Sequence, residues 1–67
     1  MEKDWIVAYT TNKIYQAEIF RELLGDHGID SYIINKQDSS YKFGNIEVYV
    51  RINDIQKAKI LVKEFES

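Results

Sequence analysis

The sole histidine of the chain, His27, directly follows Asp26, and this pair is the closest approach in the sequence to a catalytic arrangement. A histidine oriented by a carboxylate can act as a general base when a proton to be abstracted lies within hydrogen-bond reach. The surrounding pattern places no nucleophile near the pair, which falls at the end of an expected helix. We therefore interpret His27 as a solvent-exposed residue at a helix C-terminus, where the helix dipole favours its protonated form.

Metal ions and phosphate groups also lack a recognisable site in the sequence. The chain has no cysteine, so a transition-metal site would depend on carboxylates from scattered loops. The three glycines, Gly25, Gly28 and Gly44, are placed near a helix end and in a hairpin loop, not in a phosphate-binding pattern. We expect no catalytic residue, no metal and no cofactor, and we interpret the protein as non-enzymatic.

Charge limits the classes of partner. The net charge of the 67 residues is −2, which gives no general attraction to nucleic acid or anionic lipid. Charged residues make up 30% of the chain, which argues against a membrane span, and residues 1–5 do not resemble a signal peptide. We expect a cytoplasmic protein without a membrane partner. On composition alone, the candidates for binding a nucleotide are the basic residues Lys36, Lys42 and Arg51.

The elements that position these residues follow from the spacing of apolar side chains. Strands are predicted at residues 5–11, 30–36 and 46–52, which are rich in β-branched and aromatic residues. In the last of these, the predicted inward residues alternate along the strand: Ile46, Val48, Val50 and Ile52. Two amphipathic helices are predicted, one from residue 13 and one after residue 53. Their predicted buried faces are Ala17, Phe20 and Leu24, flanked by Ile14 and Leu23, and then Ile55, Ala58, Leu61, Val62 and Phe65.

The helix ends carry signals of their own. Thr11 or Asn12 is expected to cap the first helix, and Asn53 the second, where Gln56 completes a variant of the capping box. Gly28 is predicted to adopt a positive φ after the first helix, so that the next residue, Ile29, folds back onto the helix in a Schellman motif.

The predicted order of elements, β-α-β-β-α, gives a single α+β domain over residues 1–67. A parallel crossover followed by a hairpin places both helices on one face of a sheet with strand order 1-3-2. This is a two-layer sandwich like a ferredoxin-like unit without its last strand, and the first strand is left as an open edge.

A set of spaced residues resembles the pattern of a small bacterial family, the putative prokaryotic signal-transducing proteins, which are related in fold to PII-like regulators. The matching residues are, in chain order, Tyr9, Thr10, Asn12, Ala17, Leu23, Leu24, Gly28, Ile29, Asn35, Val48, Val50, Asp54 and Ala58. The resemblance covers nearly the whole chain. It implies a ferredoxin-like (PII-like) fold and a regulatory role, with a small-ligand or nucleotide sensor as the alternative to an interaction module.

Aromatic residues give the candidate interaction site. If Ile6 and Ala8 face the helices, the opposite, helix-free face of the sheet carries an unusually apolar patch. The candidate residues are Trp5, Val7, Tyr9, Tyr32 and Tyr49, together with Tyr41 and Phe43 of the 37–45 loop. In the alternative to a partner contact, the N-terminal tail or this loop folds over the open edge of the first strand, with Tyr41 and Phe43 as a lid. Three explanations stay open: a protein partner or second copy covers the face, single-stranded RNA stacks on it against the acidic balance, or the aromatics are scattered surface residues.

Two further surfaces could contact a partner: the open edge of the first strand and one side of the first helix. The segment 5–9 has neither proline nor charge to block pairing at the open edge, so self-association or partner binding is expected there or on the helix-free face. On the first helix, Tyr15 and Ile19, with Leu23 beside them, form either part of a broad buried face or a second contact ridge. We therefore expect a regulatory interaction module.

Overall fold

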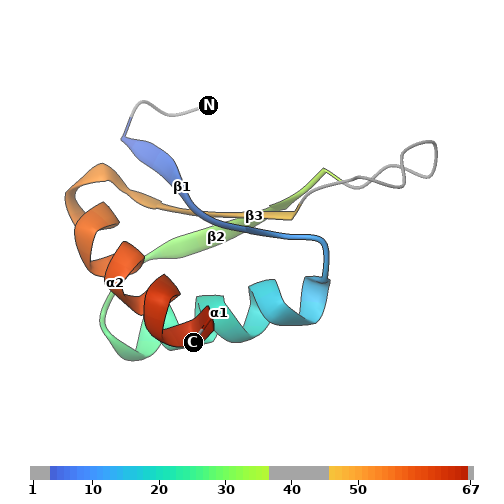
Figure 1. The fold of residues 1–67 in the computed structure, drawn as a ribbon. Helices are drawn as coiled ribbons and strands as arrows, with labels where there is room; N and C mark the ends of the chain where they lie inside the picture. Colours follow the sequence, from blue (N-terminus) through green and yellow to red (C-terminus); the bar gives the residue numbers. More distant parts are fainter. Residues whose placement is uncertain (1–3, 37–45, 67) are drawn as a thin grey trace.

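The computed structural model of the protein describes residues 4–36 and 46–66. Its elements follow the predicted order, β-α-β-β-α (Figure 1). They are β1 (Trp5–Thr11), α1 (Ile14–Asp26), β2 (Ser31–Asn35), β3 (Ile46–Arg51), a 3-10 turn (Ile52–Asp54) and α2 (Ile55–Glu66). Tyr41, Phe43, Lys42 and Gly44, all named above, lie outside the described residues.

The three strands form one antiparallel sheet in the order β1-β3-β2, so β1 and β2 are both edge strands. Both helices lie on the same face of this sheet, with α1 packed mainly on β2 and α2 mainly on β1 (Figure 1). The predicted two-layer α+β architecture is confirmed. It corresponds to a ferredoxin-like unit that lacks its last strand.

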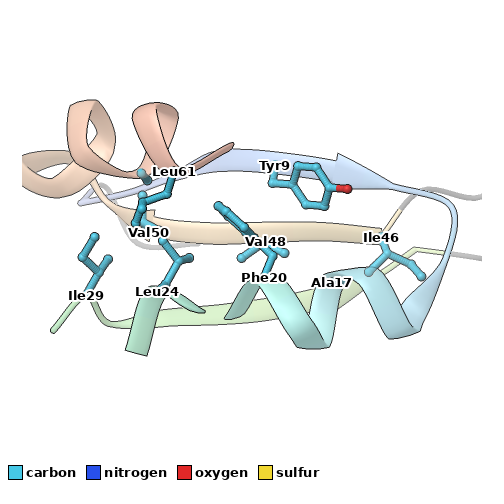
Figure 2. Packing of buried hydrophobic residues seen from close by; sticks show 10 residues of the cluster. Tyr9, Ala17, Phe20, Leu24, Ile29, Ile46, Val48, Val50 and Leu61 are labelled. Atoms are coloured by element: carbon cyan, nitrogen blue, oxygen red, sulfur yellow. The ribbon is translucent and has the colours of Figure 1, made fainter. Parts of the chain in front are cut away.

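The core fills the space between the sheet and the helices (Figure 2). Its largest fully buried side chains are Phe20, Leu24, Ile46, Val48 and Val50. These residues confirm the predicted stripe of α1 and the alternation of β3. The predicted face of α2 is likewise buried or half-buried throughout its length. Ile52 differs from the prediction: it opens the 3-10 turn and is 49% exposed, because β3 ends one residue earlier.

The end of α1 is the Schellman motif predicted from Gly28. Gly28 has a φ of 74°, and its amide donates to the carbonyl of Gly25 at 3.0 Å. The amide of Ile29 donates to the carbonyl of Leu24 at 2.9 Å, and both side chains are buried in the core. The left-handed residue therefore turns the chain so that β2 starts beneath the helix.

The predicted helix N-caps are wrong. Lys13, not Thr11 or Asn12, occupies the N-cap position of α1, and its side chain makes no capping hydrogen bond. Thr11 still makes a hydrogen bond next to the helix N-terminus: its Oγ1 accepts from the amide of Lys13 at 3.2 Å. Asn53 lies inside the 3-10 turn, which leads directly into α2 at Ile55.

A β-bulge changes the direction of side chains halfway along β1. Val7 pairs with Tyr49 and Tyr9 pairs with Val48, so Ala8 is the extra residue of the bulge. Directly paired residues share a face of the sheet. Tyr9 is therefore on the helix side, 7% exposed, and the prediction that it lies on the helix-free face is wrong (Figure 2).

Candidate functional site

Three aromatic rings from the three strands meet on the helix-free face of the sheet. The ring centroids of Trp5 and Tyr32 are 4.8 Å apart in an edge-to-face arrangement. The ring of Tyr32 stacks on that of Tyr49, with centroids 5.1 Å apart and an interplanar angle of 2°. Because Trp5 and Tyr32 belong to the two edge strands, their contact crosses over the central strand β3. We call Trp5, Tyr32 and Tyr49 the aromatic cluster.

The aromatic cluster is largely closed against solvent within one chain. Tyr49 is 5% exposed although no helix covers it, whereas Trp5, Tyr32 and the neighbouring Val7 are half-buried. Aromatic pairs of this kind contribute about 0.5–1.5 kcal/mol beyond the area that they bury. The cluster therefore acts first as a second, small core that ties both edge strands to β3, and its outer rims remain accessible.

A charged network borders the cluster at one end. The carboxylate of Glu47 accepts a hydrogen bond from the Tyr49 hydroxyl at 2.9 Å and forms an ion pair with Lys36 at 3.0 Å. Burial raises the pKa of Glu47, but the hydrogen bonds from Lys36 and Tyr49 and the charge of Lys36 outweigh it, so the pKa is lowered overall. The hydrogen bond to Glu47 raises the pKa of Lys36 and also that of Tyr49.

Arg51 borders the cluster at the other end. Its guanidinium carbon lies 4.6 Å from the ring centroid of Trp5, and its Nε is 3.8 Å from a carboxylate oxygen of Asp30. At the first end of the cluster, Lys36 pairs with Glu47, which lies four residues before Arg51 on β3. Four strand positions span about 13 Å, so Lys36 and Arg51 are held about that far apart. Of the three basic residues considered for an anionic ligand, these two therefore do not converge, and each already contacts a carboxylate.

The outer edge of β1 is the second feature of this surface. β1 pairs with β3 on one side, and no described strand pairs with it on the other. Ile6 faces the helix layer, since it pairs with the buried Val50, yet it is 41% exposed because it lies at this edge. The edge thus combines a backbone that no described strand pairs with and an exposed apolar side chain.

His27 takes the place predicted for it at the end of α1. It is exposed, and its Nδ1 lies 3.0 Å from the carbonyl oxygen of Leu23 in the preceding turn. In the described part of the chain, no group of three or more His, Cys, Asp or Glu side chains could hold a metal ion. No helix among the described residues is long and apolar enough to cross a membrane.

The structure thus brings together four of the seven candidate site residues, Trp5, Val7, Tyr32 and Tyr49. Tyr9 belongs to the main core, where its ring lies 4.9 Å from that of Phe20. Sequence reasoning missed the charged residues at the ends of the cluster as neighbours of the aromatics. The clean alternation of β3 was an available signal, because it already placed Glu47 and Arg51 on the same face as Tyr49.

Comparison with known proteins identifies a family for the chain. No curated protein and no solved structure matches the sequence. One family model, described as "putative prokaryotic signal transducing protein", matches residues 5–66, and these residues contain every described helix and strand. The chain therefore belongs to the family of putative prokaryotic signal transducing proteins.

Proposed function

We propose that the protein is a non-enzymatic interaction module of bacterial signalling, acting in the cytoplasm, and that it binds a partner protein at the edge of β1. The observation that carries this proposal is that no described strand pairs with the outer side of β1, the position that a further strand would occupy in a complete ferredoxin-like unit. Membership of the signal-transducing family supports a regulatory role.

The chemistry of the edge suits an added strand. An extended segment can pair with exposed backbone groups of an edge strand, while its alternate side chains give specificity. Edge strands that must stay unpaired usually carry charge or proline, and the seven residues of β1 have neither. A segment with apolar residues at alternate positions would extend the sheet beside Ile6 and cover its exposed side chain.

The aromatic cluster adds a second contact beside this edge. Trp5 starts β1 and contacts both Tyr32 and Arg51, so its ring is held in one orientation before any partner arrives. Tryptophan and arginine are among the residue types that most often dominate binding energy at interfaces. A partner strand at β1 would therefore meet a preorganised rim on the helix-free face.

The alternative function, a small-ligand or nucleotide sensor, has less support. An anionic ligand needs unpaired basic groups that converge, and Lys36 and Arg51 are about 13 Å apart along the sheet and engaged with Glu47 and Asp30 respectively.

A charge placed at the edge tests the proposal. Ile6→Lys puts a lysine on β1, whereas Ile14→Lys puts the same residue on α1 at almost the same exposure, 41% against 42%. Tagged wild-type and variant proteins are used to capture partners from lysate of the native bacterium. We expect Ile6→Lys to lose the partner that the wild type and Ile14→Lys retain.

Hydrogen exchange then locates the contact. With the captured partner bound, the amides of β1 are expected to exchange more slowly than in the free protein. Equal capture by all three proteins, or slowed exchange confined to the helices, would show that the partner binds elsewhere.

A further inference from the structure

The most exposed large apolar side chains of the described chain do not lie on the helix-free face. They are Ile6, Ile14, Tyr15, Ile19, Ile52 and Ile60. Three of these, Tyr15, Ile19 and Ile60, are the most exposed, at 54%, 53% and 60%, and they belong to the two helices that cover the other face of the sheet. The exposure of Tyr15 and Ile19 contradicts the interpretation that they belong to a broad buried face, and the contact ridge stays a prediction.

The outer surface of α1 carries three carboxylates beside its apolar ridge, and Lys13 lies over the ring of Tyr15 at the start of the helix, with its Nζ 5.9 Å from the ring centroid. At 100° per residue, Tyr15 and Ile19 lie away from the buried stripe of Ala17, Phe20 and Leu24. Glu18, Glu22 and Asp26 follow at spacings that place them beside the ridge, and all three are exposed. An apolar ridge flanked by three carboxylates fits a partner surface that is apolar and basic.

The outer surface of α2 carries an exposed isoleucine between two lysines, with Glu64 one turn further on the same side. Ile60 points away from the buried Ala58 and Leu61, and Lys57 and Lys63 lie three residues before and after it. Within the described residues, neither lysine forms an ion pair, and neither do the three carboxylates of α1. Both sets of charges are therefore available to a partner.

The two helices are placed so that one surface can match a second copy of itself. A hollow of about 340 Å³ is lined by His27 and Ile29 after α1 and by Lys57, Ile60 and Leu61 of α2, so the end of α1 lies near the start of α2. At the opposite end of the layer, Gln16 and Phe65 line a common hollow. The helices thus run side by side in opposite directions (Figure 1).

We propose that the helix layer is a homodimer interface in which α1 of each protomer packs on α2 of the other. A two-fold axis parallel to the helices produces this arrangement. In the antiparallel register that sets Asp26 opposite the second copy's Lys57, Leu23 lies opposite the second copy's Ile60, and Ile19 lies about one helical turn from that Ile60 and opposite Glu64. The other face-to-face arrangement sets α1 against α1 and brings like carboxylates together, which is unfavourable.

The area of the contact face indicates how tightly the two copies bind each other. Two helices of 13 and 12 residues are about 20 Å long and pack about 10 Å apart, so the contact face is roughly 20 Å by 20 Å. Stable interfaces bury about 800 Å² on each partner, and smaller ones belong to transient complexes. The dimer is accordingly weak and concentration-dependent, with a dissociation constant of roughly tens to hundreds of micromolar.

This interface leaves the β1 edge and the aromatic cluster uncovered, because they lie at the side and on the opposite face of the sheet. The dimer and the partner complex of the proposed function are therefore independent. A dimer presents two β1 edges at once. A partner that carries two binding segments would bind the two linked edges more tightly than one edge alone.

A charge swap tests the dimer. In the proposed dimer, Asp26 of each copy attracts Lys57 of the other, so there are two such contacts. Asp26→Lys or Lys57→Glu alone makes both contacts repulsive. The double variant makes both attractive again and keeps the wild-type net charge. The substitutions spare the fold, because a cation at the end of α1 and an anion at the start of α2 both suit the helix dipoles. Sedimentation velocity is measured at low salt from about 10 μM to 1 mM, a range that brackets the expected constant.

We expect each single variant to weaken dimerisation by about tenfold and the double variant to restore it to within about threefold of the wild type. Ile60→Lys, which removes the central apolar contact, is expected to leave a monomer. Ile6→Lys is expected to dimerise like the wild type, even where it loses the partner. A wild type that is monomeric up to about 1 mM, a double variant as weak as the singles, or dimerisation lost in Ile6→Lys would each overturn the proposal.

Discussion

Replacing Trp5 by alanine distinguishes a structural role of the aromatic cluster from a role in docking alone. The substitution removes the edge-to-face contact with Tyr32 and the stacking of Arg51 on the indole ring. The ring pair contributes about 0.5–1.5 kcal/mol and an exposed cation–π contact about 0.5–1 kcal/mol. Loss of the apolar surface that a half-buried tryptophan covers adds about 1–2 kcal/mol.

These contributions sum to about 3 kcal/mol, a large share of the roughly 3–10 kcal/mol expected for a domain of this length. The midpoint of thermal unfolding is expected to fall by about 12–24 °C. The free energy of unfolding is best measured by urea titration followed by far-UV circular dichroism, because the variant has lost the sole tryptophan of the chain. Protein at a few micromolar, well below the expected dimer constant, keeps self-association out of the measurement.

Tyr15→Ala is the matched control, since Tyr15 is an aromatic residue that is 54% exposed on α1. Its expected effect on the free energy of unfolding is within about 0.5 kcal/mol. If Trp5→Ala also stays within about 1 kcal/mol of the wild type, the cluster does not stabilise the chain, and its role is confined to binding.

Two further predictions concern the helix end and the charged network. Gly28→Ala should lower the free energy of unfolding by about 1–2 kcal/mol, because φ is 74° there while the space around its Cβ position is open; Gly25→Ala, in the same helix turn and equally open, should raise it by about 0.5–1 kcal/mol. Both are measured by urea unfolding, and a loss in Gly25→Ala or none in Gly28→Ala would contradict the assignment of the Schellman motif. The pKa of Glu47 is lowered in the folded protein, so its carboxylate stabilises the fold above the pKa of an unfolded glutamate, about 4.3. This stabilisation is lost as the pH falls below that value and through the lower pKa of the folded state. The raised pKa values of Lys36 and Tyr49 predict stability that is present below about pH 10 and lost as pH rises through their folded values. Glu47→Gln should flatten both limbs when the free energy of unfolding is followed from about pH 3 to 11; unchanged limbs would show that the network does not contribute.

The fold was predictable because its strongest signals are local. Gly28 followed by Ile29 specifies the helix end through one backbone conformation and one apolar contact, and both occur as predicted. The alternation of β3 places its inward and outward residues without knowledge of the neighbours. These features depend on a few consecutive residues, so a single sequence contains them.

The candidate site was predictable only in part, because it depends on pairing between strands. Both faces of β1 are apolar, so the alternation of side chains along the strand does not predict the bulge at Ala8. It therefore does not predict that Tyr9 faces the core either. The contact of Trp5 with Tyr32 crosses β3 and requires the register of all three strands. The prediction of the first helix cap was wrong although Thr11 and Asn12 are both capping types: Lys13 is the N-cap residue, and Thr11 accepts a hydrogen bond from its amide instead.

In the complex proposed above, the bulge at Ala8 would limit how long the partner stays bound. It re-aims the backbone of β1 between Val7 and Tyr9, so a docking strand can follow the edge regularly for only about three residues on either side of it. Few main-chain hydrogen bonds then hold the partner, and complexes of this kind dissociate rapidly. The same interruption keeps edges of different molecules from pairing along their full length into aggregates. If β1 binds a partner as proposed, its irregular edge would make that contact readily reversible, as a signalling contact requires.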